Sequence, residues 1–149
     1  MKLQVSSRLA IYALMELADG SDRQVSVTEI GEKYDISAHH LAKVMHTLGR
    51  AGLVRSIRGV GGGYVFCGNA RRTTLLDVIV LFENPSAGQE DIDAAKETPA
   101  GIALEKVLTE IDEIALATLG AITLSTLQKH KKRLERAGGD PVLSLLAEP

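Results

Sequence analysis

Residues 36–75 read ISAHHLAKVMHTLGRAGLVRSIRGVGGGYVFCGNARRTTL. The first half of this stretch predicts a helix, because Ser37 can cap its start and Gly52 offers a left-handed stop at its end. Two β-prone runs follow, Leu53–Ile57 and Tyr64–Phe66, with a glycine-rich connection between them. This pattern is typical of a hairpin whose tip carries few side chains.

Two more helices are predicted before this stretch. The first runs from about Ser7 to Ala18, with apolar residues at helical spacing. The second begins at Ser26 and ends near Tyr34. Its sequence Ser26–Glu29 is a capping box, in which the hydroxyl and the carboxylate can each satisfy a free backbone amide. Three helices followed by a hairpin predict a winged helix-turn-helix, a mostly α fold with a small β-wing.

The rest of the chain predicts three further helices. Thr74 can cap a short one over about Leu75–Phe82, and Thr123 can cap the last one, which ends before Gly138 and Gly139. A polar, acidic linker and a long helix lie between these two. We therefore expect a winged helix-turn-helix domain over residues 1–83, a linker over 84–98, and a long helix with a C-terminal helix over 99–149.

The long helix carries an apolar seam. Its members recur at alternating steps of three and four residues, and acidic residues lie off the seam. This spacing predicts that the helix packs against a partner helix. Packing within the helix's own domain is the alternative, because the seam lasts less than three heptads. The residues expected at the dimer interface are Leu104, Val107, Ile111, Ile114 and Thr118.

Length and composition exclude several classes of protein. With 149 residues the chain has the size of one domain. Its composition, with 45% hydrophobic but only 3% aromatic residues, favours a helical core of Leu, Ile, Val and Ala. Apolar stretches such as Leu75–Phe82 are too short to span a membrane, and the N-terminus lacks a signal-peptide pattern, so we expect a cytoplasmic protein. The single cysteine, Cys67, excludes an intrachain disulfide.

The charges are divided along the chain. From Ile36 to Leu75 there are six basic residues and no acidic residue, a net charge of +6. From Leu76 to Glu113 there are ten acidic and two basic residues, a net charge of -8. This asymmetry predicts one surface that meets a polyanion and another that faces away from it, although ordinary solvated faces would give the same count.

The helix over residues 38–50 has two faces. At 100° per residue, His39, Lys43, His46 and Arg50 fall within an arc of roughly 60°, and the apolar residues fall opposite. A stripe of donors and cations on this face suits a reader of the DNA major groove, whereas a merely solvated face is the alternative. With the hairpin, the candidate DNA-binding residues are Ser37, His39, His40, Lys43, His46, Arg50, Arg55, Arg58, Gly59, Gly61, Gly62 and Gly63.

Other chemistries do not match these residues. His39 and His46 lie two helical turns apart, about 10 Å, which is too far for one helix to hold one metal ion through both. The glycines of the hairpin fit neither a dinucleotide fingerprint nor a phosphate loop, because Tyr64 stands where a glycine is needed and Asn69 follows Gly68 without the Lys and Ser/Thr. The sequence therefore indicates no enzyme, no cofactor and no metal.

The chain resembles the Rrf-type family of bacterial winged helix-turn-helix transcription regulators, which includes the iron-sulfur cluster regulator and a nitric-oxide-sensitive repressor branch. The resemblance covers essentially the whole chain. It implies a homodimeric repressor that pairs through its long helix and reads a palindromic operator, with the third helix in major grooves and the wing in minor grooves of double-stranded DNA. The residues that carry it are Ile36–Ser37, His40–Val44, Leu48, Ala51–Val54, Arg58–Gly59, Gly62–Tyr64 and Ile122–Leu124.

The chain departs from this family at one point. Cluster-binding members carry three cysteines in the segment that corresponds to Asn84–Thr98 and the start of the long helix, and this chain has none there. Its linker carries acidic residues instead, which are poor ligands for an iron-sulfur cluster. They suit a solvated loop or a divalent metal. We therefore expect a regulator without a cluster, and the sequence leaves its effector unknown. The acidic residues of the linker are Glu90, Asp91, Asp93 and Glu97.

Two other functions stay open at this point. The chain could be a protein-interaction module that keeps the fold and binds a partner through its acidic half. It could also be a thiol-based redox sensor, because Arg71 and Arg72 lie close to Cys67 in sequence and oxidation beside the wing would alter a DNA contact. Against the sensor, a free cysteine often behaves as a small buried hydrophobe, and such a cysteine is inert.

Overall fold

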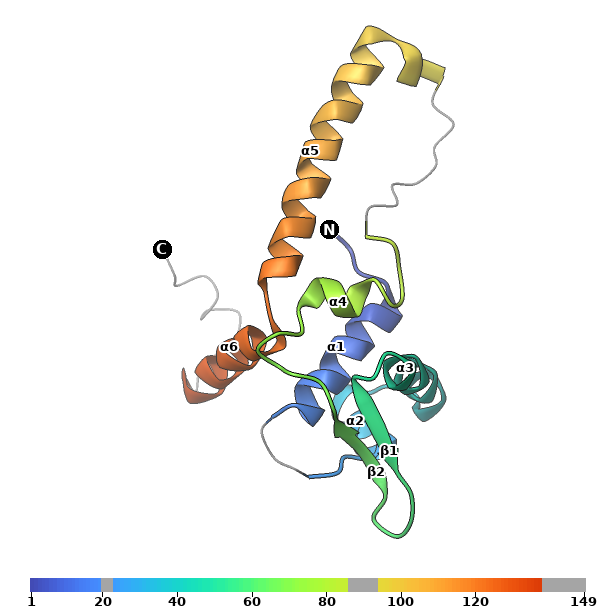
Figure 1. The fold of residues 1–149 in the computed structure, drawn as a ribbon, viewed down its shortest axis with the longest axis vertical. Coiled ribbons are helices and arrows are strands. Elements are labelled where there is room, and N and C mark those ends of the chain that lie inside the picture. The colour runs from blue at the N-terminus through green and yellow to red at the C-terminus, as the bar shows by residue number, and fades with distance from the viewer. Residues whose placement is uncertain (20–22, 86–93, 138–149) are drawn as a thin grey trace.

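The computed structural model describes residues 1–19, 23–85 and 94–137 (Figure 1). Helices predominate, and the one sheet in this part of the chain is a two-stranded antiparallel hairpin. This arrangement confirms the predicted winged helix-turn-helix. The elements are α1 (Val5–Leu17), α2 (Val27–Tyr34), α3 (Ala38–Arg50), β1 (Val54–Ile57), β2 (Gly63–Phe66), α4 (Leu75–Ile79), the 3₁₀ turn η1 (Ala94–Glu97), α5 (Pro99–Ala121) and α6 (Leu124–Ala137).

The predicted caps fix most helix starts. The hydroxyls of Ser37 and Thr123 accept hydrogen bonds from the backbone amides three residues later, at 3.2 Å in both cases. At α4, Thr74 and Asp77 form a complete capping box. Ser26 accepts from the Glu29 amide at 3.0 Å, but the Glu29 carboxylate binds Arg23 at 2.6 Å. The reciprocal half of the predicted box is thus replaced by an ion pair.

Two helix bounds differ from the prediction for identifiable reasons. α1 begins at Val5, because the Glu83 carboxylate accepts hydrogen bonds from the Gln4 amide (3.0 Å) and from the Ser7 hydroxyl. Because Glu83 lies far along the chain from α1, no local sequence pattern predicts this cap. α4 ends at Ile79 because Leu81 and Phe82 form tighter bonds to carbonyls three residues back.

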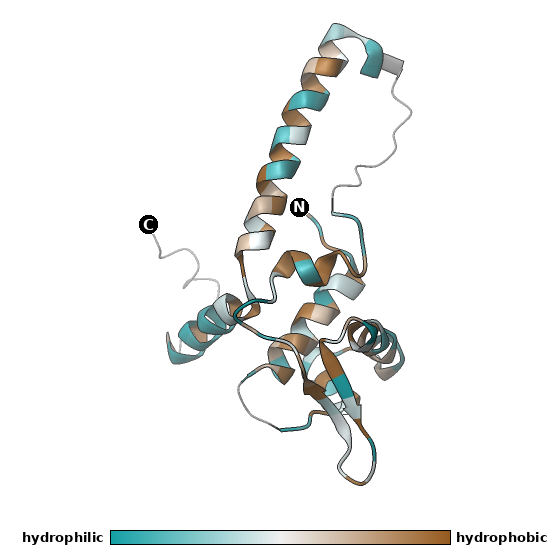
Figure 2. Ribbon diagram, in the orientation of Figure 1, coloured by the Kyte–Doolittle hydropathy of each residue, from teal (hydrophilic) through white to brown (hydrophobic). Residues whose placement is uncertain are grey.

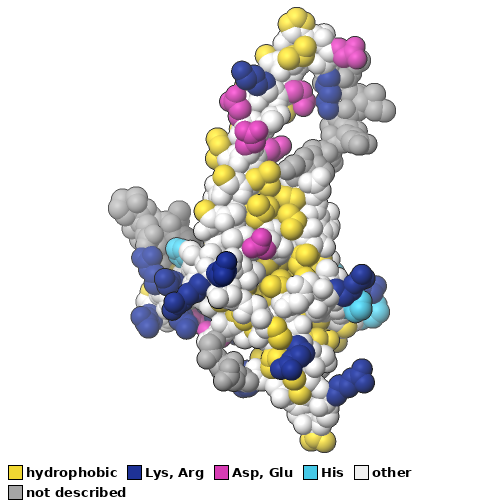
Figure 3. Space-filling model, viewed as in Figure 1, with side chains coloured by type: hydrophobic (Ala, Val, Ile, Leu, Met, Phe, Trp, Pro, Cys, Tyr) yellow, Lys and Arg dark blue, Asp and Glu magenta, His cyan; other side chains and the backbone are white. Residues whose placement is uncertain are grey.

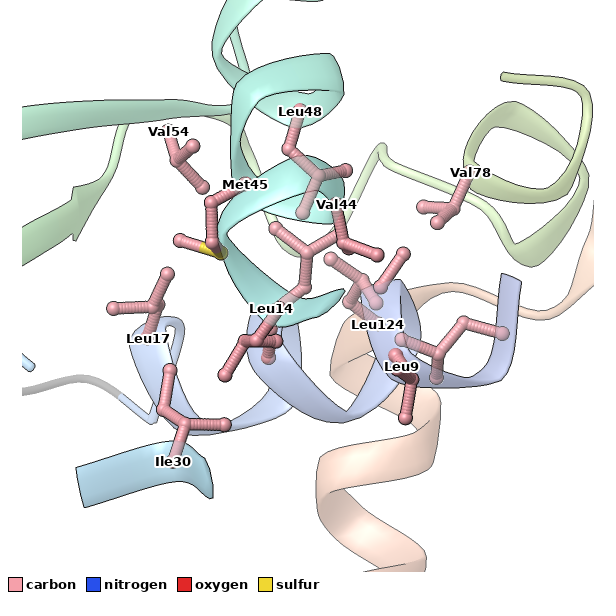
Figure 4. Packing of buried hydrophobic residues seen from close by; sticks show 14 of the residues in the cluster. Leu9, Leu14, Leu17, Ile30, Val44, Met45, Leu48, Val54, Val78 and Leu124 are labelled. Carbon is pink, nitrogen blue, oxygen red and sulfur yellow. The ribbon is translucent and has the colours of Figure 1, made fainter. Parts of the chain in front are cut away.

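The core lies where α1 meets α3 and α6. Leu14, Met45 and Leu124 are fully buried and converge there, as Figure 4 shows. Leu124 also donates its backbone amide to the Thr73 carbonyl at 2.9 Å. The C-terminal helix therefore packs on the winged-helix body, although the chain between them makes the long excursion of α5.

α5 projects away from this body as a single 23-residue helix (Figure 1). Apolar and polar residues alternate along its length, as Figure 2 shows. Thr98 caps its start, accepting from the Gly101 amide at 3.1 Å, and Pro99 takes the first turn, where no amide donor is needed. None of the helices described here has the length and hydropathy needed to cross a membrane.

The predicted linker is described in part. Its end forms the turn η1 before α5, and Glu97 lies in that turn. Glu90, Asp91 and Asp93 lie outside the described residues, as do Gly138 and Gly139.

Candidate nucleic-acid interface

α3 presents one polar face outward. His39, Lys43, His46 and Arg50 are exposed, because the opposite face of the helix is held in the core. The buried residues of that opposite face are Leu41, Val44, Met45 and Leu48. The helix therefore displays imidazole, ammonium and guanidinium groups along one stripe, with no carboxylate on it.

Ser37 and His40 lie beside this stripe rather than on it. The Ser37 hydroxyl accepts from the His40 amide as the N-cap of α3. The His40 ring is half-buried, and its Nε2 lies 3.3 Å from the Ser6 hydroxyl oxygen on α1. The first turn of the helix is thus tied to α1, and these two residues position the stripe.

The hairpin is anchored at its base. In its register Arg55 lies opposite Val65 and Ser56 opposite Tyr64. Tyr64 also exchanges two backbone hydrogen bonds with Val25, at 2.8 and 3.0 Å, so the segment before α2 adds a third short edge to the hairpin. This bridge holds the wing beside α3, and the Arg55 and Arg58 side chains on it are exposed.

The four candidate glycines of the wing have different roles. Gly59 and Gly61 have positive φ angles, 111° and 72°, which the turn at the tip requires. A β-carbon at Gly62 would lie 2.5 Å from the Ile57 carbonyl oxygen, and one at Gly63 would lie 2.7 Å from that of Val25. Gly62 and Gly63 therefore allow close backbone packing within the protein.

A groove separates α3 from the hairpin. Its volume is about 440 Å³, and polar groups of both elements line it: His46 and Arg50 from α3, Ser56 and Tyr64 from the strands. Neither Ser56 nor Tyr64 is among the candidates predicted from the sequence. Pairing the two predicted β-runs across the glycines places Ser56 opposite Tyr64. Which face of the hairpin meets α3, however, depends on tertiary packing and cannot be predicted from this local pattern.

The charges of the surface are separated in space as well as in sequence. Figure 3 shows most of the visible acidic side chains over the outer part of α5, with lysines among them, whereas most of the basic side chains and the histidines lie over the lower body. All six basic residues of the stretch 36–75 are exposed: Lys43, Arg50, Arg55, Arg58, Arg71 and Arg72.

The seam of α5 is uncovered in the single chain. Leu104, Val107, Ile111 and Ile114 are between 51 and 67% exposed. Thr118 is exposed too, and its hydroxyl is satisfied within the helix by the Ile114 carbonyl at 2.8 Å. The helix therefore carries an apolar stripe that its own chain does not cover within the described residues.

Cys67 follows β2 and is exposed. Its backbone amide donates to the Leu53 carbonyl at 2.8 Å, which extends the hairpin by one contact. The expectation that this cysteine is buried is wrong. Its Sγ lies 3.8 Å from the Val65 carbonyl oxygen of β2 rather than in the core.

Comparisons with known proteins agree with this geometry. The model of the Rrf2 family, described as an iron-dependent transcriptional regulator, matches residues 3–130. BadM of Rhodopseudomonas palustris, which carries the name of a helix-turn-helix (HTH) transcriptional regulator, is 49% identical over 140 residues, covering 91% of this chain and 89% of BadM. The HTH-type transcriptional regulator IscR of Xenorhabdus nematophila is 31% identical over 147 residues, 92% of this chain and 85% of IscR.

A solved structure has the same fold. CymR of B. subtilis, described as its global cysteine regulator, superimposes with a TM-score of 0.73 at 26% identity, over 87% of this chain and 98% of CymR.

Proposed function

This chain belongs to the Rrf2 family of transcriptional regulators, and from this premise we propose that it is a cytoplasmic homodimeric repressor that binds a palindromic DNA operator without an iron-sulfur cluster. The observation that carries the proposal is the acid-free surface formed by the outer face of α3 and the wing. A polyanion is the partner that such a surface attracts.

The two elements supply two kinds of contact. The α3 stripe projects donors far enough to reach base edges in a major groove, where Lys and Arg pair with guanine acceptors. The wing tip is narrow and carries Val60 between Gly59 and Gly61. Such a tip can enter a minor groove, and Arg58 beside it is placed for the backbone or the groove floor.

The groove between α3 and the hairpin supports the same assignment. Major and minor grooves of DNA are separated by one phosphate backbone, so a protein with an element in each must accommodate that backbone between them. His46, Arg50, Ser56 and Tyr64 line this space and offer hydrogen-bond donors. We propose Ser56 and Tyr64 as phosphate contacts that add to the DNA-binding residues predicted from the sequence.

A second copy of the chain is the proposed partner of α5. Five large apolar residues along one face of this helix are exposed, whereas monomeric proteins rarely leave a long contiguous apolar stripe in water. Two copies of the same helix can bury one another's stripes. The two-fold symmetry of that dimer would match a palindromic operator. The five residues are Leu104, Val107, Leu108, Ile111 and Ile114.

The family description includes iron, and the residues of this chain do not fit an iron-sulfur cluster. Clusters of this kind are held by cysteine thiolates. The chain has one cysteine, Cys67, which lies on the wing rather than next to α5. Within the described ranges, no three His, Cys, Asp or Glu side chains gather closely enough to hold a metal ion. The proposal therefore assigns no step to iron.

Genomic binding sites would test the main proposal most directly. Chromatin immunoprecipitation and sequencing should recover a palindromic sequence. A duplex carrying it should bind the purified protein at nanomolar concentration in moderate salt. A protein-interaction module with the same fold would bind no such duplex, so the same measurement decides between the two functions.

The exposure of Cys67 bears on the third function, a thiol-based sensor, because peroxide can reach its sulfur. Operator binding by wild type and Cys67→Ser, with and without peroxide, tests it. Equal responses of the two proteins would exclude the switch.

A further inference from the structure

A cavity of about 400 Å³ lies between the N-terminal segment and α1. This volume is in the range of pockets that hold small ligands. None of the residues that line it is among the candidate DNA-binding residues of α3 and the wing. The residues that line it are Met1, Lys2, Leu3, Arg8, Ile11 and Tyr12.

The charged groups around this cavity have one sign. Lys2 and Arg8 are the charged side chains of its lining, and both are exposed. Within the described residues, neither side chain takes part in an ion pair or a hydrogen bond. Glu16 lies two turns further along α1, but its carboxylate already binds Lys33 at 2.8 Å and Lys131 at 3.3 Å. The two cations of the cavity are therefore available to an anion.

The walls of the cavity are apolar, and one of them is rigid. The Tyr12 ring stacks on Tyr34, with centroids 5.0 Å apart and planes 8° from parallel. Ile11 is buried in the core and its exposed edge forms the adjoining wall. A ligand that fits must therefore join an apolar body to a negatively charged head.

We propose that this cavity binds a small organic carboxylate and is the effector site of the protein. The head would pair with Arg8 and Lys2, since a guanidinium matches a carboxylate with two parallel hydrogen bonds. The apolar body would lie against Ile11 and Tyr12.

The position of the cavity links it to the DNA-binding face. Ser6 lies in the same turn of α1 as Arg8, and its hydroxyl lies 3.3 Å from Nε2 of His40 on α3. A ligand that moved this turn would act on the start of α3 through the contact between Ser6 and His40. This regulatory half rests on the proposed function, whereas ligand binding itself does not.

Hexanoate is a suitable probe, with 1-hexanol and hexylamine as matched compounds that keep the body and change the head. In a ¹⁵N chemical-shift titration of the full chain, we expect saturable shifts at residues 1–12 with hexanoate, and at least about ten-fold weaker binding of the other two. Arg8→Gln should weaken hexanoate about ten-fold. Arg136→Gln, which removes an exposed arginine on α6, should leave hexanoate binding unchanged.

Equal affinity for all three compounds, no saturable shifts, or undiminished binding by Arg8→Gln would overturn the site. Melting curves of the two variants serve to check that both are folded. The effector role is tested by operator affinity with and without saturating hexanoate. If hexanoate binds and operator affinity does not change, the effector role is wrong. A protein that binds no duplex at all contradicts the proposed function instead, and the titration still decides the site.

Discussion

Gly63 and Val25 pack so closely that a β-carbon on Gly63 would lie 2.7 Å from the Val25 carbonyl oxygen. The contact arises because Val25 and Tyr64 exchange two backbone hydrogen bonds. The wing is thus fastened at its base to the segment that leads into α2. This makes Gly63 part of the support of the wing.

We expect Gly63→Ala to destabilise the protein by about 1–3 kcal/mol, the usual cost of forcing an atom into a packed site. Because the bridge positions the wing, operator affinity should fall as well. Urea unfolding and gel-shift titration measure the two effects.

Gly120→Ala, in α5, is the matched control. Its β-carbon would meet Leu76 of α4 at an ordinary 3.6 Å, so the free energy of unfolding should stay equal or rise by up to about 1 kcal/mol. A Gly63→Ala protein as stable as wild type would show that the bridge opens at no cost.

The wing shows how far the sequence alone leads. The pattern of residues 53–66 predicted the hairpin and its tip, because turn chemistry is local. The same pattern predicted one role, approach to DNA, for all four glycines. The packing of Gly63 on Val25 could not be predicted in this way, because it depends on a contact between residues nearly 40 positions apart. The cap of α1 by Glu83 and the place of Leu124 in the core were missed for the same reason. Capping hydroxyls and the two faces of α3 were predictable, since each is fixed within one or two turns of helix.

Lys43→Ala and Arg58→Ala should each lose operator binding while the protein stays folded and dimeric, because both side chains are exposed. Loss of a phosphate contact lowers affinity for all sequences and flattens the salt dependence by about one unit. Loss of a base contact costs about 1–3 kcal/mol and relaxes specificity. Gel shifts at several salt concentrations distinguish the two. Lys129→Ala on α6 serves as the control, and wild-type affinity in both test variants would refute the assignment of this surface.

Ile111→Asp should dissociate the dimer. Ile111 lies in the middle of the exposed seam of α5, and a carboxylate there would be buried without a partner in the paired helices. The dimer dissociation constant should rise about 100-fold or more, and operator binding should weaken with it. Analytical ultracentrifugation measures this, with Ile111→Leu as the control that keeps the site apolar. A variant that sediments as a dimer would place the interface elsewhere on the molecule.

The Glu16 carboxylate joins three helices and makes the stability of the fold depend on pH. Burial by itself raises the pKa of this carboxyl, but hydrogen bonds from Lys33 and Tyr34 and the charges of Lys131 and Lys33 outweigh it, so the pKa of Glu16 is lowered. Because its pKa is lower in the folded state than in the unfolded state, Glu16 stabilises the fold at pH values above its unfolded-state pKa of about 4.3. This contribution is lost as the pH falls through the lower pKa of the folded state.

Glu16→Gln should therefore reduce the free energy of unfolding by about 1.5–3 kcal/mol at pH 7, the range for hydrogen bonds to a charged group. The difference from wild type should shrink towards pH 3. Urea unfolding across this range measures it. Glu32→Gln, which removes an exposed carboxylate on α2, should behave like wild type at every pH. A constant difference for Glu16→Gln would mean that packing, not charge, is what this residue contributes.

Protein purified without oxygen should be colourless and contain no stoichiometric iron or sulfide. The reason is the donor set: cluster irons need thiolates, and the one thiol of this chain, Cys67, lies at the end of β2. Carboxylates of the linker and of α5 are hard ligands, which favour other metals. Metal analysis and an absorption spectrum of the anaerobic protein are the measurements, and reconstitution with ferrous iron and sulfide is the stricter form of the test. A brown preparation whose colour disappears in air together with operator binding would mean that this chain holds a cluster through ligands other than three cysteines of its own.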